Sequence, residues 1–416
     1  MENDLEKVLE YIEEEDVKFI RLAFRDAFGV QKNISVMPGE LPKAIRDGIP
    51  INARAIAGFE GCKESDLYLK PDTSTMSVLP WRPDSGKVVR LFCDTYTSSG
   101  RYFEGDTRYI LKMAVDKAKE KGFEFKFGSE TEFYLFKKDD EGNITEEPYD
   151  NAGYMDIAPL DKGENIRREI CLTIEKMGLT PERSHHERGP GQNEIDFHYG
   201  RPLKAADQMT TFKMVVNTVA DRNGLKADFS PMPIRHMPGN GYHINIYANS
   251  ESGEDMADYV AAGIMDRIRD ITIFLNPAEA SYARFGRSTA PDRVNWSDIG
   301  ESELLFIDRH PGRKTRVELR SPDAMSNPYI VYALLIHAGL YGIENKLELP
   351  EINDENGPML PKTREEAAAA AALMARTGSS PASIAFCAFC TAFARPTYAG
   401  SLRERANSDS ASGFER

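Results

Sequence analysis

Glu130 and Glu132 lie two residues apart in the stretch FKFGSETEFYLF (residues 125–136), where polar and apolar side chains alternate. This alternation predicts a half-buried β-strand, and a strand projects residues i and i+2 from the same face. Two carboxylates held side by side repel each other and raise each other's pKa. The pair therefore predicts that a positively charged group lies nearby.

Three further segments place ionisable or amide side chains on a strand face or in a glycine-rich loop. They are Glu187 and Glu194 in SHHERGPGQNEIDFHYG, His243 and Asn245 in NGYHINIYANS, and Arg316, Glu318 and Arg320 in RKTRVELRSPD. Each segment alone has a simpler interpretation: solvated carboxylates, a hydrogen-bonded structural histidine, or a cross-strand row of salt bridges. Their recurrence favours one shared site instead. Five carboxylates and one imidazole are a suitable ligand set for two hard divalent cations, Mg²⁺ or Mn²⁺.

Arginines next to such metal ions suit anionic phosphate or carboxylate groups, because the guanidinium offers a planar fork of donors. The sequence has no glycine-rich phosphate-binding turn of the P-loop type. Metal ions with arginines therefore predict phosphoryl transfer on a different scaffold.

Composition limits the classes of protein to which the chain can belong. The 416 residues are 41% hydrophobic and 28% charged, with a net charge of −14, which argues against nucleic acid or an anionic membrane as partner. Five scattered cysteines argue against a disulfide framework and favour a cytoplasmic protein. The C-x-x-C spacing of Cys387 and Cys390 stands alone in an alanine-rich context, so we do not interpret it as a metal or redox site. The acidic start argues against a signal peptide.

The periodicity of the chain predicts an α+β protein. Residues 1–100 alternate short apolar runs with turns behind an N-terminal helix, which indicates a small, mostly β domain. Residues 101–416 mix the two periodicities: helices are predicted near 109–122, 165–178, 206–224, 254–273 and 327–346, and strands near 125–136, 242–248 and 315–320. From about residue 367 to 416 the pattern starts helically and then loses its period, so we expect an atypical, poorly ordered tail.

The ordered motifs GSETEFYLF, HHERGPGQNEIDF, NGYHINI and RVELRSPDAMSNPY closely resemble those of glutamine synthetases of type I. The similarity runs from about residue 15 to 345. The resemblance implies a β-grasp N-terminal domain followed by a catalytic α+β domain with a curved antiparallel sheet. It also implies a homo-dodecamer of two stacked hexameric rings, with each active site between neighbouring subunits.

The resemblance implies a role for each candidate residue. One metal ion would be held by Glu132, Glu187 and Glu194, and the second by Glu130, His243 and Glu318. Arg284, in SYARF, would hold the substrate carboxylate, and Arg320 would lie near the transferred phosphoryl group. Arg313, Arg316 and Asn245 fall at nucleotide-binding positions. The implied reaction phosphorylates the γ-carboxylate of glutamate with ATP, after which ammonia attacks the acyl phosphate to give glutamine.

The sequence departs from the family pattern around the ammonia-binding half of this site. Asn52, in INARAIAG, stands where the family has an aspartate that binds and deprotonates ammonium. Thr289 stands where a flap glutamate is usual, Ile299 replaces an arginine, and Glu301 reverses another charge. An amide or a hydroxyl cannot replace a carboxylate as a base or as a counter-charge for ammonium.

Three functions therefore remain open. The first is a glutamate–ammonia ligase, the family default. The second is a γ-glutamyl ligase that uses a larger amine, or a ligase that uses another carboxylate, because an amine that arrives partly neutral needs those carboxylates less. The third is a non-catalytic, ring-forming member of the family.

Overall fold

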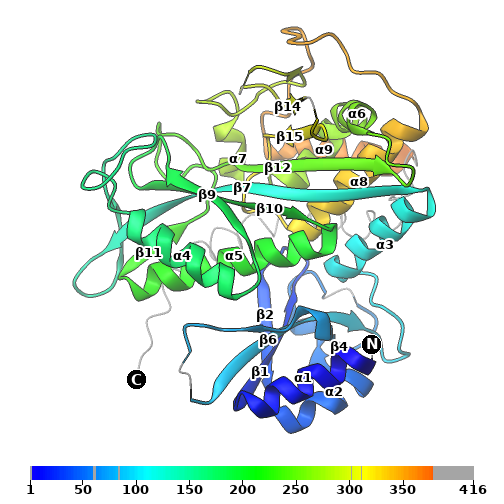
Figure 1. Cartoon of the computed structure of the whole chain (residues 1–416). Helices are drawn as coiled ribbons and strands as arrows, with labels where there is room; N and C mark the ends of the chain where they lie inside the picture. Colours follow the sequence, from blue (N-terminus) through cyan, green and yellow to red (C-terminus); the bar gives the residue numbers. More distant parts are fainter. Residues whose placement is uncertain (1, 60–61, 83–84, 301, 311, 378–416) are drawn as a thin grey trace.

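The computed structural model describes residues 2–59, 62–82, 85–300, 302–310 and 312–377. The chain forms a smaller part around one sheet and a larger part around a second sheet (Figure 1). The strands of the smaller part fall within residues 17–96 and those of the larger part within residues 123–319.

The smaller part holds a six-stranded sheet with the order β2-β1-β6-β4-β3, in which β5 pairs with β6. Its elements are α1 (Glu2–Glu14), β1 (Val17–Arg25), β2 (Gln31–Val36), α2 (Leu41–Asp47), β3 (Ile49–Asn52), β4 (Asp66–Pro71), β5 (Ser77–Val78) and β6 (Lys87–Tyr96). Strands β1 and β6 run parallel and β1 and β2 antiparallel. Ile20, Leu22 and Leu91 are fully buried, so the alternating apolar residues supply the core of this part.

The larger part holds a nine-stranded sheet with the order β13-β14-β15-β12-β7-β10-β9, in which β8 and β11 pair with β7. The strands are β7 (Phe123–Lys138), β8 (Ile144–Pro148), β9 (Pro181–His186), β10 (Gln192–Gly200), β11 (Leu225–Asp228), β12 (Tyr242–Ser250), β13 (Trp296–Ser297), β14 (Leu305–Asp308) and β15 (Arg316–Leu319). Every neighbour of the long central strand β7 is antiparallel to it.

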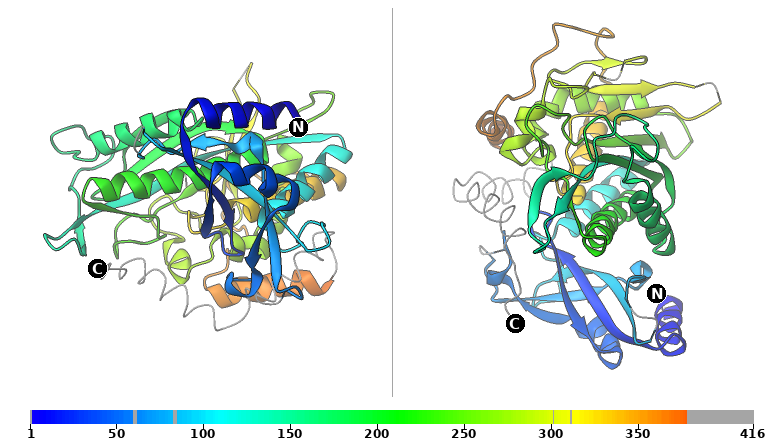
Figure 2. Two further views of the ribbon diagram at one scale, coloured as in Figure 1. Left: turned by 90° about the horizontal axis from the view of Figure 1, so that it is seen from below. Right: turned by 90° about the vertical axis from the view of Figure 1, so that its left-hand side faces the viewer.

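Helices pack against this sheet and against one another (Figure 2). They are α3 (Thr107–Glu120), α4 (Glu164–Lys176), α5 (Pro202–Arg222), α6 (Ala257–Leu275), α7 (Glu279–Arg284), α8 (Pro328–Glu344) and α9 (Arg364–Thr377). Phe127 of β7 stacks on Tyr332 of α8 at 4.3 Å between ring centroids, and Phe133 of β7 meets Phe212 of α5 edge-on at 6.2 Å. The odd-numbered residues of β7 therefore face the helices.

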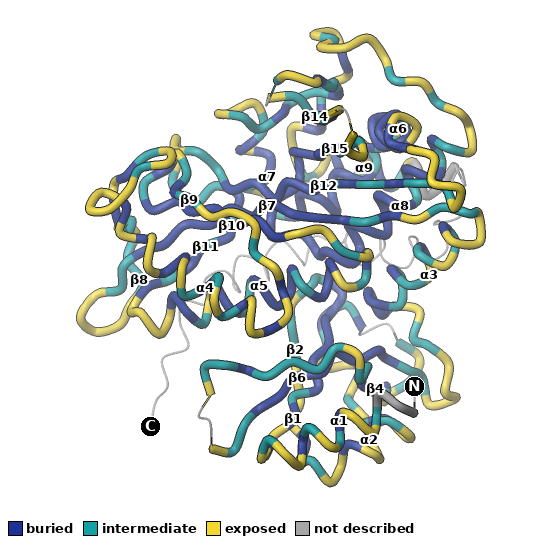
Figure 3. The backbone as a smooth tube through the Cα atoms, in the orientation of Figure 1, coloured by how far each residue is buried: buried dark blue, intermediate teal, exposed yellow. Residues whose placement is uncertain are grey.

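Burial follows this arrangement. Figure 3 shows the central strands β7 and β12 largely buried, whereas the loops that leave the sheet are exposed. The predicted α+β class and the β-grasp N-terminal part are confirmed, and helices and strands occur near all of the predicted positions.

The expected tail begins as a packed helix. Ala367 and Ala371 of α9 are buried, and α9 packs against α6. The remainder of the predicted tail, with Cys387 and Cys390, lies outside the described residues. Among the residues that the structure describes, no helix is both long enough and apolar enough to cross a membrane.

A cluster of buried charges joins the two parts. Arg108 of α3 donates to Asp94 of β6 at 2.6 Å, to Asp72 at 2.8 Å and to Asp207 of α5 at 3.1 Å. The Tyr329 hydroxyl of α8 donates to Asp207 at 2.5 Å. Because Asp72 and Asp94 belong to the smaller part and the other three residues to the larger part, this cluster fixes one part on the other.

Candidate active site

The register of the sheet brings the predicted acidic residues together. The cross-strand partners are Glu132 with Glu194, Glu130 with Asp196, Glu130 with His243, and Asn245 with Glu318. Directly paired residues project from the same face of a sheet. Since Thr131 and Phe133 face the helices, Glu130 and Glu132 project from the opposite face, as their spacing predicted.

Glu130, His243 and Glu318 form one compact group. One potential ligand atom from each lies within 4.8 Å of the others. The Nδ1 atom of His243 is 3.6 Å from a carboxylate oxygen of Glu130 and 3.6 Å from one of Glu318. All three residues are at most 9% exposed. This donor set, with three residues from three strands, has the composition expected of a site for a divalent cation.

The second group differs from the predicted one in one member. Glu187 and Glu194 cluster with His185, whose Nε2 atom lies 2.9 Å from a carboxylate oxygen of Glu187. Glu132 instead accepts hydrogen bonds from the Gln192 amide at 2.8 Å and from the Gly241 backbone at 3.0 Å. Sequence reasoning missed His185, although strand alternation places residues 185 and 187 on the same face.

The two groups carry an excess of negative charge. Burial, together with Asp196, Glu132, Glu130 and Glu187, raises the pKa of Glu194 well above its usual range. Burial and the neighbouring Glu130 raise the pKa of Asp196 to about 6. Buried carboxylates at this density are unfavourable unless a cation lies among them. The residues therefore fit divalent metal ions by their chemistry as well as by their spacing.

Glu130 is compensated within the chain. Burial alone would raise its pKa, but hydrogen bonds from His243 and Asn245 and the charge of Arg316 lower the pKa to about 2. Arg316 donates to a carboxylate oxygen of Glu130 at 3.2 Å and to the side-chain oxygen Oδ1 of Asn245 at 3.0 Å. Arg320, which is 8% exposed, donates to Glu318. Arg316, at the start of β15, and Arg320, directly after its end, therefore both border the group of Glu130, His243 and Glu318.

A cavity of about 580 Å³ opens beside Glu130. It is lined by all three predicted nucleotide-binding residues, Asn245, Arg313 and Arg316, and by residues that sequence reasoning missed, among them Arg183, Lys314, Tyr199 and Tyr247. The rings of Tyr199 and Tyr247 lie 4.5 Å apart between centroids. Cations and aromatic faces next to a metal-binding group suit a nucleotide, with its charged phosphates and planar base.

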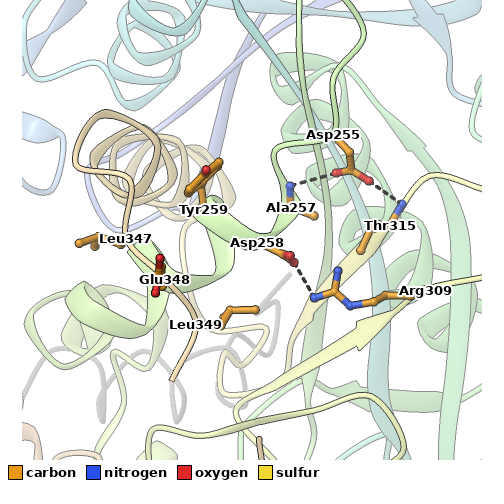
Figure 4. A pocket seen from close by; sticks show the side chains of 9 residues that line it. All are labelled: Asp255, Ala257, Asp258, Tyr259, Arg309, Thr315, Leu347, Glu348 and Leu349. Carbon is orange, nitrogen blue, oxygen red and sulfur yellow. Dashed lines mark hydrogen bonds and ion pairs between the residues drawn. The ribbon is translucent and has the colours of Figure 1, made fainter. Parts of the chain in front are cut away.

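A second cavity, of about 520 Å³, lies beside the β14–β15 hairpin and contrasts with the first (Figure 4). Three of its charged side chains are already engaged: Asp258 pairs with Arg309 at 2.5 Å, and Asp255 accepts from the backbones of Ala257 and Thr315. Only Arg309 is basic among its lining residues. The first cavity is therefore the better candidate for binding a phosphate-bearing ligand.

Arg284 lies near the acidic groups but does not present its guanidinium to an open surface. It is 3% exposed and donates to the backbone carbonyls of Ser321 and Pro322. Gly239 is packed against it, since a Cβ there would lie 2.8 Å from the Arg284 side chain. Both of these bonds come from one terminal nitrogen of the guanidinium, and the Nε atom of Arg284 is buried without a hydrogen-bond partner among the described residues.

The predicted residues of the ammonia-binding half are placed outside the two groups. Asn52 is exposed at the end of β3, where its side chain accepts from the Arg54 backbone at 3.0 Å. Thr289 lies in a turn closed by a hydrogen bond between the backbones of Gly286 and Ala290. Ile299 is 84% exposed. Glu301 lies outside the described residues.

Comparison with known proteins agrees with the motifs. A sequence model of the glutamine synthetase β-grasp domain matches residues 16–98, and one of the glutamine synthetase catalytic domain matches residues 104–378. A glutamine synthetase of Clostridium saccharobutylicum is 42% identical over 358 residues, which cover 83% of this chain and 81% of the relative. One of Methanosarcina mazei is 40% identical over 364 residues, covering 84% and 81%.

Solved structures share the fold. A GmaS–ADP complex superposes with a TM-score of 0.82 at 24% identity, covering 98% of this chain and 97% of the other. GmaS without ligand gives a TM-score of 0.80 at 25% identity with the same coverage. With both family models matched and 40% identity to curated relatives over most of its length, the chain belongs to the glutamine synthetase family of ATP-dependent ligases.

Proposed function

We propose that this chain phosphorylates the γ-carboxylate of glutamate with ATP and then joins the acyl group to ammonia, giving glutamine, ADP and phosphate. The observation that supports this most is the excess of buried carboxylates on one face of the sheet, directly beside a cavity lined in part by arginine, lysine and tyrosine side chains. An acidic face attracts metal ions, and the adjoining cations attract the phosphates of a nucleotide.

The six predicted metal ligands keep the assignments that the family resemblance gives them. Glu130, His243 and Glu318 hold one ion, and Glu132, Glu187 and Glu194 hold the other, with His185 as an additional donor or as the partner that orients Glu187. When bound, such ions neutralise the charge that develops on phosphoryl oxygens. Mg²⁺ and Mn²⁺ both suit this oxygen-rich set with few imidazoles.

The chain's own groups bind and orient the substrates. Arg313, Lys314 and Arg316 hold the nucleotide phosphates in the 580 Å³ cavity, and Arg320 offers donors to the phosphoryl group in transit. A carboxylate oxygen of glutamate attacks the γ-phosphorus, and the bond to ADP breaks. The amine nitrogen then attacks the acyl carbon, phosphate leaves, and the nitrogen loses a proton to a carboxylate at the site.

We also propose that the active site is completed by a neighbouring subunit in a dodecamer of two hexameric rings. Asn52 is exposed on the smaller part and contacts its own turn. Both parts present exposed apolar side chains: Phe19, Ile34 and Met37 on the smaller one, and Tyr154, Met155, Ile157 and Leu160 on the larger one. Two unlike apolar surfaces on one chain suit a head-to-tail contact, which generates a ring when the rotation between subunits closes. Mass photometry of the purified protein tests this assembly.

A larger amine as acceptor is the second candidate. Asn52 and Thr289 supply no carboxylate for ammonium. In addition, Arg188 follows Glu187 in the chain; it is exposed, and its guanidinium lies 5.6 Å from the Tyr154 ring centre. An arginine beside Glu187 reduces the local attraction for a small cation such as ammonium. Selection of a larger amine, whose binding draws on apolar contacts, is consistent with these replacements.

The deciding experiment measures phosphate release from ATP with Mg²⁺ and glutamate, comparing ammonium with primary amines and polyamines. Release that rises with ammonium supports glutamine synthesis, and release only with a larger amine supports the second candidate. Asn52→Asp is the matched variant: it should lower the KM for ammonium at least about tenfold, because a carboxylate adds roughly 1.4 kcal/mol or more of attraction. Absence of release with every amine would contradict both.

A further inference from the structure

Glu187 stands at the start of a tight connection between β9 and β10, and Glu194 follows three residues after its end. Within the connection, Gln192 donates its backbone N–H to the Gly189 carbonyl at 3.0 Å, and Glu187 donates to the Gln192 carbonyl at 2.8 Å. Gly191 has a φ of +68°, and a Cβ there would lie 2.8 Å from the Leu135 carbonyl. The loop 187–191 therefore has little freedom in its backbone.

His186 fastens the start of this loop. Its side chain is fully buried, with Nδ1 2.6 Å from the Glu187 carbonyl oxygen and Nε2 2.8 Å from a carboxylate oxygen of Asp150. The same oxygen of Asp150 accepts from the Gly191 backbone at 3.0 Å. One carboxylate thus ties the residue before Glu187 to the residue that ends the loop.

Asn193 fastens the other end of the loop. Its amide donates to the Gly191 carbonyl at 2.9 Å, and its carbonyl accepts from Arg167 at 2.6 Å. Arg167 pairs in turn with Asp161. All four of these polar residues, Asp161, Arg167, His186 and Asn193, are at most 4% exposed. They form a buried layer behind the loop, and none of them belongs to either acidic group.

Asp150, Asp161 and His186 have the spacing of a metal-binding trio. Their ligand atoms are already engaged, however. Both ring nitrogens of His186 have hydrogen-bond partners, and both carboxylate oxygens of Asp161 meet Arg167. A buried trio whose atoms are satisfied by the chain does not require an ion.

We infer that Asp150, His186 and Asn193 are positioning residues that hold loop 187–191, and that they thereby set metal affinity at the Glu187 group and not at the Glu130 group. The inference rests on the proposed function only in taking Glu187 as a metal ligand. The physical reason is that groups hydrogen-bonded behind a metal ligand fix its orientation, and their loss typically costs about 10- to 100-fold in metal affinity.

The test is a Mn²⁺ titration of the purified full chain, followed by electron paramagnetic resonance of the free ion. Two variants test the two hydrogen bonds of His186 separately. The amide nitrogen of asparagine can replace Nδ1, and the amide nitrogen of glutamine can replace Nε2. His186→Asn keeps the donor to the Glu187 carbonyl, so it should lose less affinity than His186→Gln. The latter should weaken one of two sites by at least about tenfold and leave the other within about threefold.

Glu187→Gln identifies which site is affected, because His186→Gln should weaken the same site that Glu187→Gln removes. Asn193→Asp, which keeps the acceptor for Arg167 and removes the donor to Gly191, tests the loop end independently if the His186 variants fail to fold. Thr272→Val is the control: it removes a buried hydroxyl that donates to Ile268 in α6, at 2.7 Å, and should change neither site.

Equal weakening of both sites, or no change at either site, would overturn the inference, and so would equal effects of His186→Asn and His186→Gln. A wild-type chain that binds no Mn²⁺ would overturn the proposed metal centre together with it. If the wild type binds two ions and the variants weaken both sites equally or weaken neither, only the positioning role is overturned.

Discussion

Arg108 and Glu194 are both buried charged side chains surrounded by carboxylates, but those carboxylates oppose the charge of Arg108 and repeat the charge of Glu194. Arg108 lies among Asp72, Asp94 and Asp207, all within 3.1 Å, and although burial lowers its pKa, these carboxylates raise the pKa well above its usual range. Glu194 lies among other carboxylates. The first cluster contains its own cation, whereas the carboxylates around Glu194 repel it, and this difference separates a structural cluster from a site that binds a cation.

Arg108→Met should produce the largest effect. It removes the cation that three aspartates share at the junction of the two parts, and among the described residues only Asp94 keeps another cationic partner, Lys112. Breaking a buried ion pair costs about 3–5 kcal/mol. Urea unfolding should show this loss with and without Mn²⁺. Arg46→Met, in an exposed pair with Asp47, is the matched control and should leave the unfolding midpoint unchanged. A loss that Mn²⁺ restores would contradict the structural role of the Arg108 cluster.

Glu194→Gln should change stability in the opposite direction. Without metal, the variant should be more stable than the wild type by about 1–2 kcal/mol, because it removes one of several repelling buried charges. With Mn²⁺ the order should reverse, since the wild type gains binding energy that the variant has lost. Thermal unfolding at neutral pH with EDTA or Mn²⁺ measures both arms, and Glu120→Gln on an exposed helix face serves as control. A metal-free variant less stable than the wild type would argue that the cluster is satisfied internally.

Lys213 extends the comparison to a half-buried cation that donates to a backbone carbonyl, that of Ala324. Burial, with a smaller contribution from Arg25, lowers its pKa to about 7. Between pH 7 and 10.5 the unfolded chain therefore binds a proton at this lysine that the folded chain does not, so stability rises with pH across that window. Lys213→Met should remove up to about 1.4 kcal/mol per pH unit of this slope. Urea unfolding of both proteins from pH 7 to 9 measures it, and equal slopes would show that Lys213 stays charged.

Local sequence patterns predicted on which face of its strand each side chain lies, but not which side chains from other strands lie next to it. Alternation in FKFGSETEFYLF places Glu130 and Glu132 on one face because that period belongs to the strand itself. The pairing of Glu132 with Glu194, and of Glu130 with His243, depends on register between strands that lie far apart in the sequence.

The residues that sequence reasoning missed are those whose role depends on tertiary contacts. The spacing of His185 and Glu187 is visible in the sequence, but the position of His185 opposite Glu194 depends on the pairing of β9 with β10. Asp150 meets His186 across 36 residues of chain. Arg284 keeps its predicted role at the substrate as a prediction, and the contacts of its guanidinium with the carbonyls of Ser321 and Pro322 could not be read from its own sequence context. The domain limits at residues 1–100 and 101–416, and the roles assigned to the site residues, remain predictions.

The count of bound metal ions tests the central claim most directly. Isothermal titration of the metal-free chain with Mn²⁺ should give two ions per chain, with one lost in Glu318→Gln and the other in Glu187→Gln. That result would show that the acidic face is divided between two cations as proposed. No binding, or a single ion that neither substitution removes, would contradict the account.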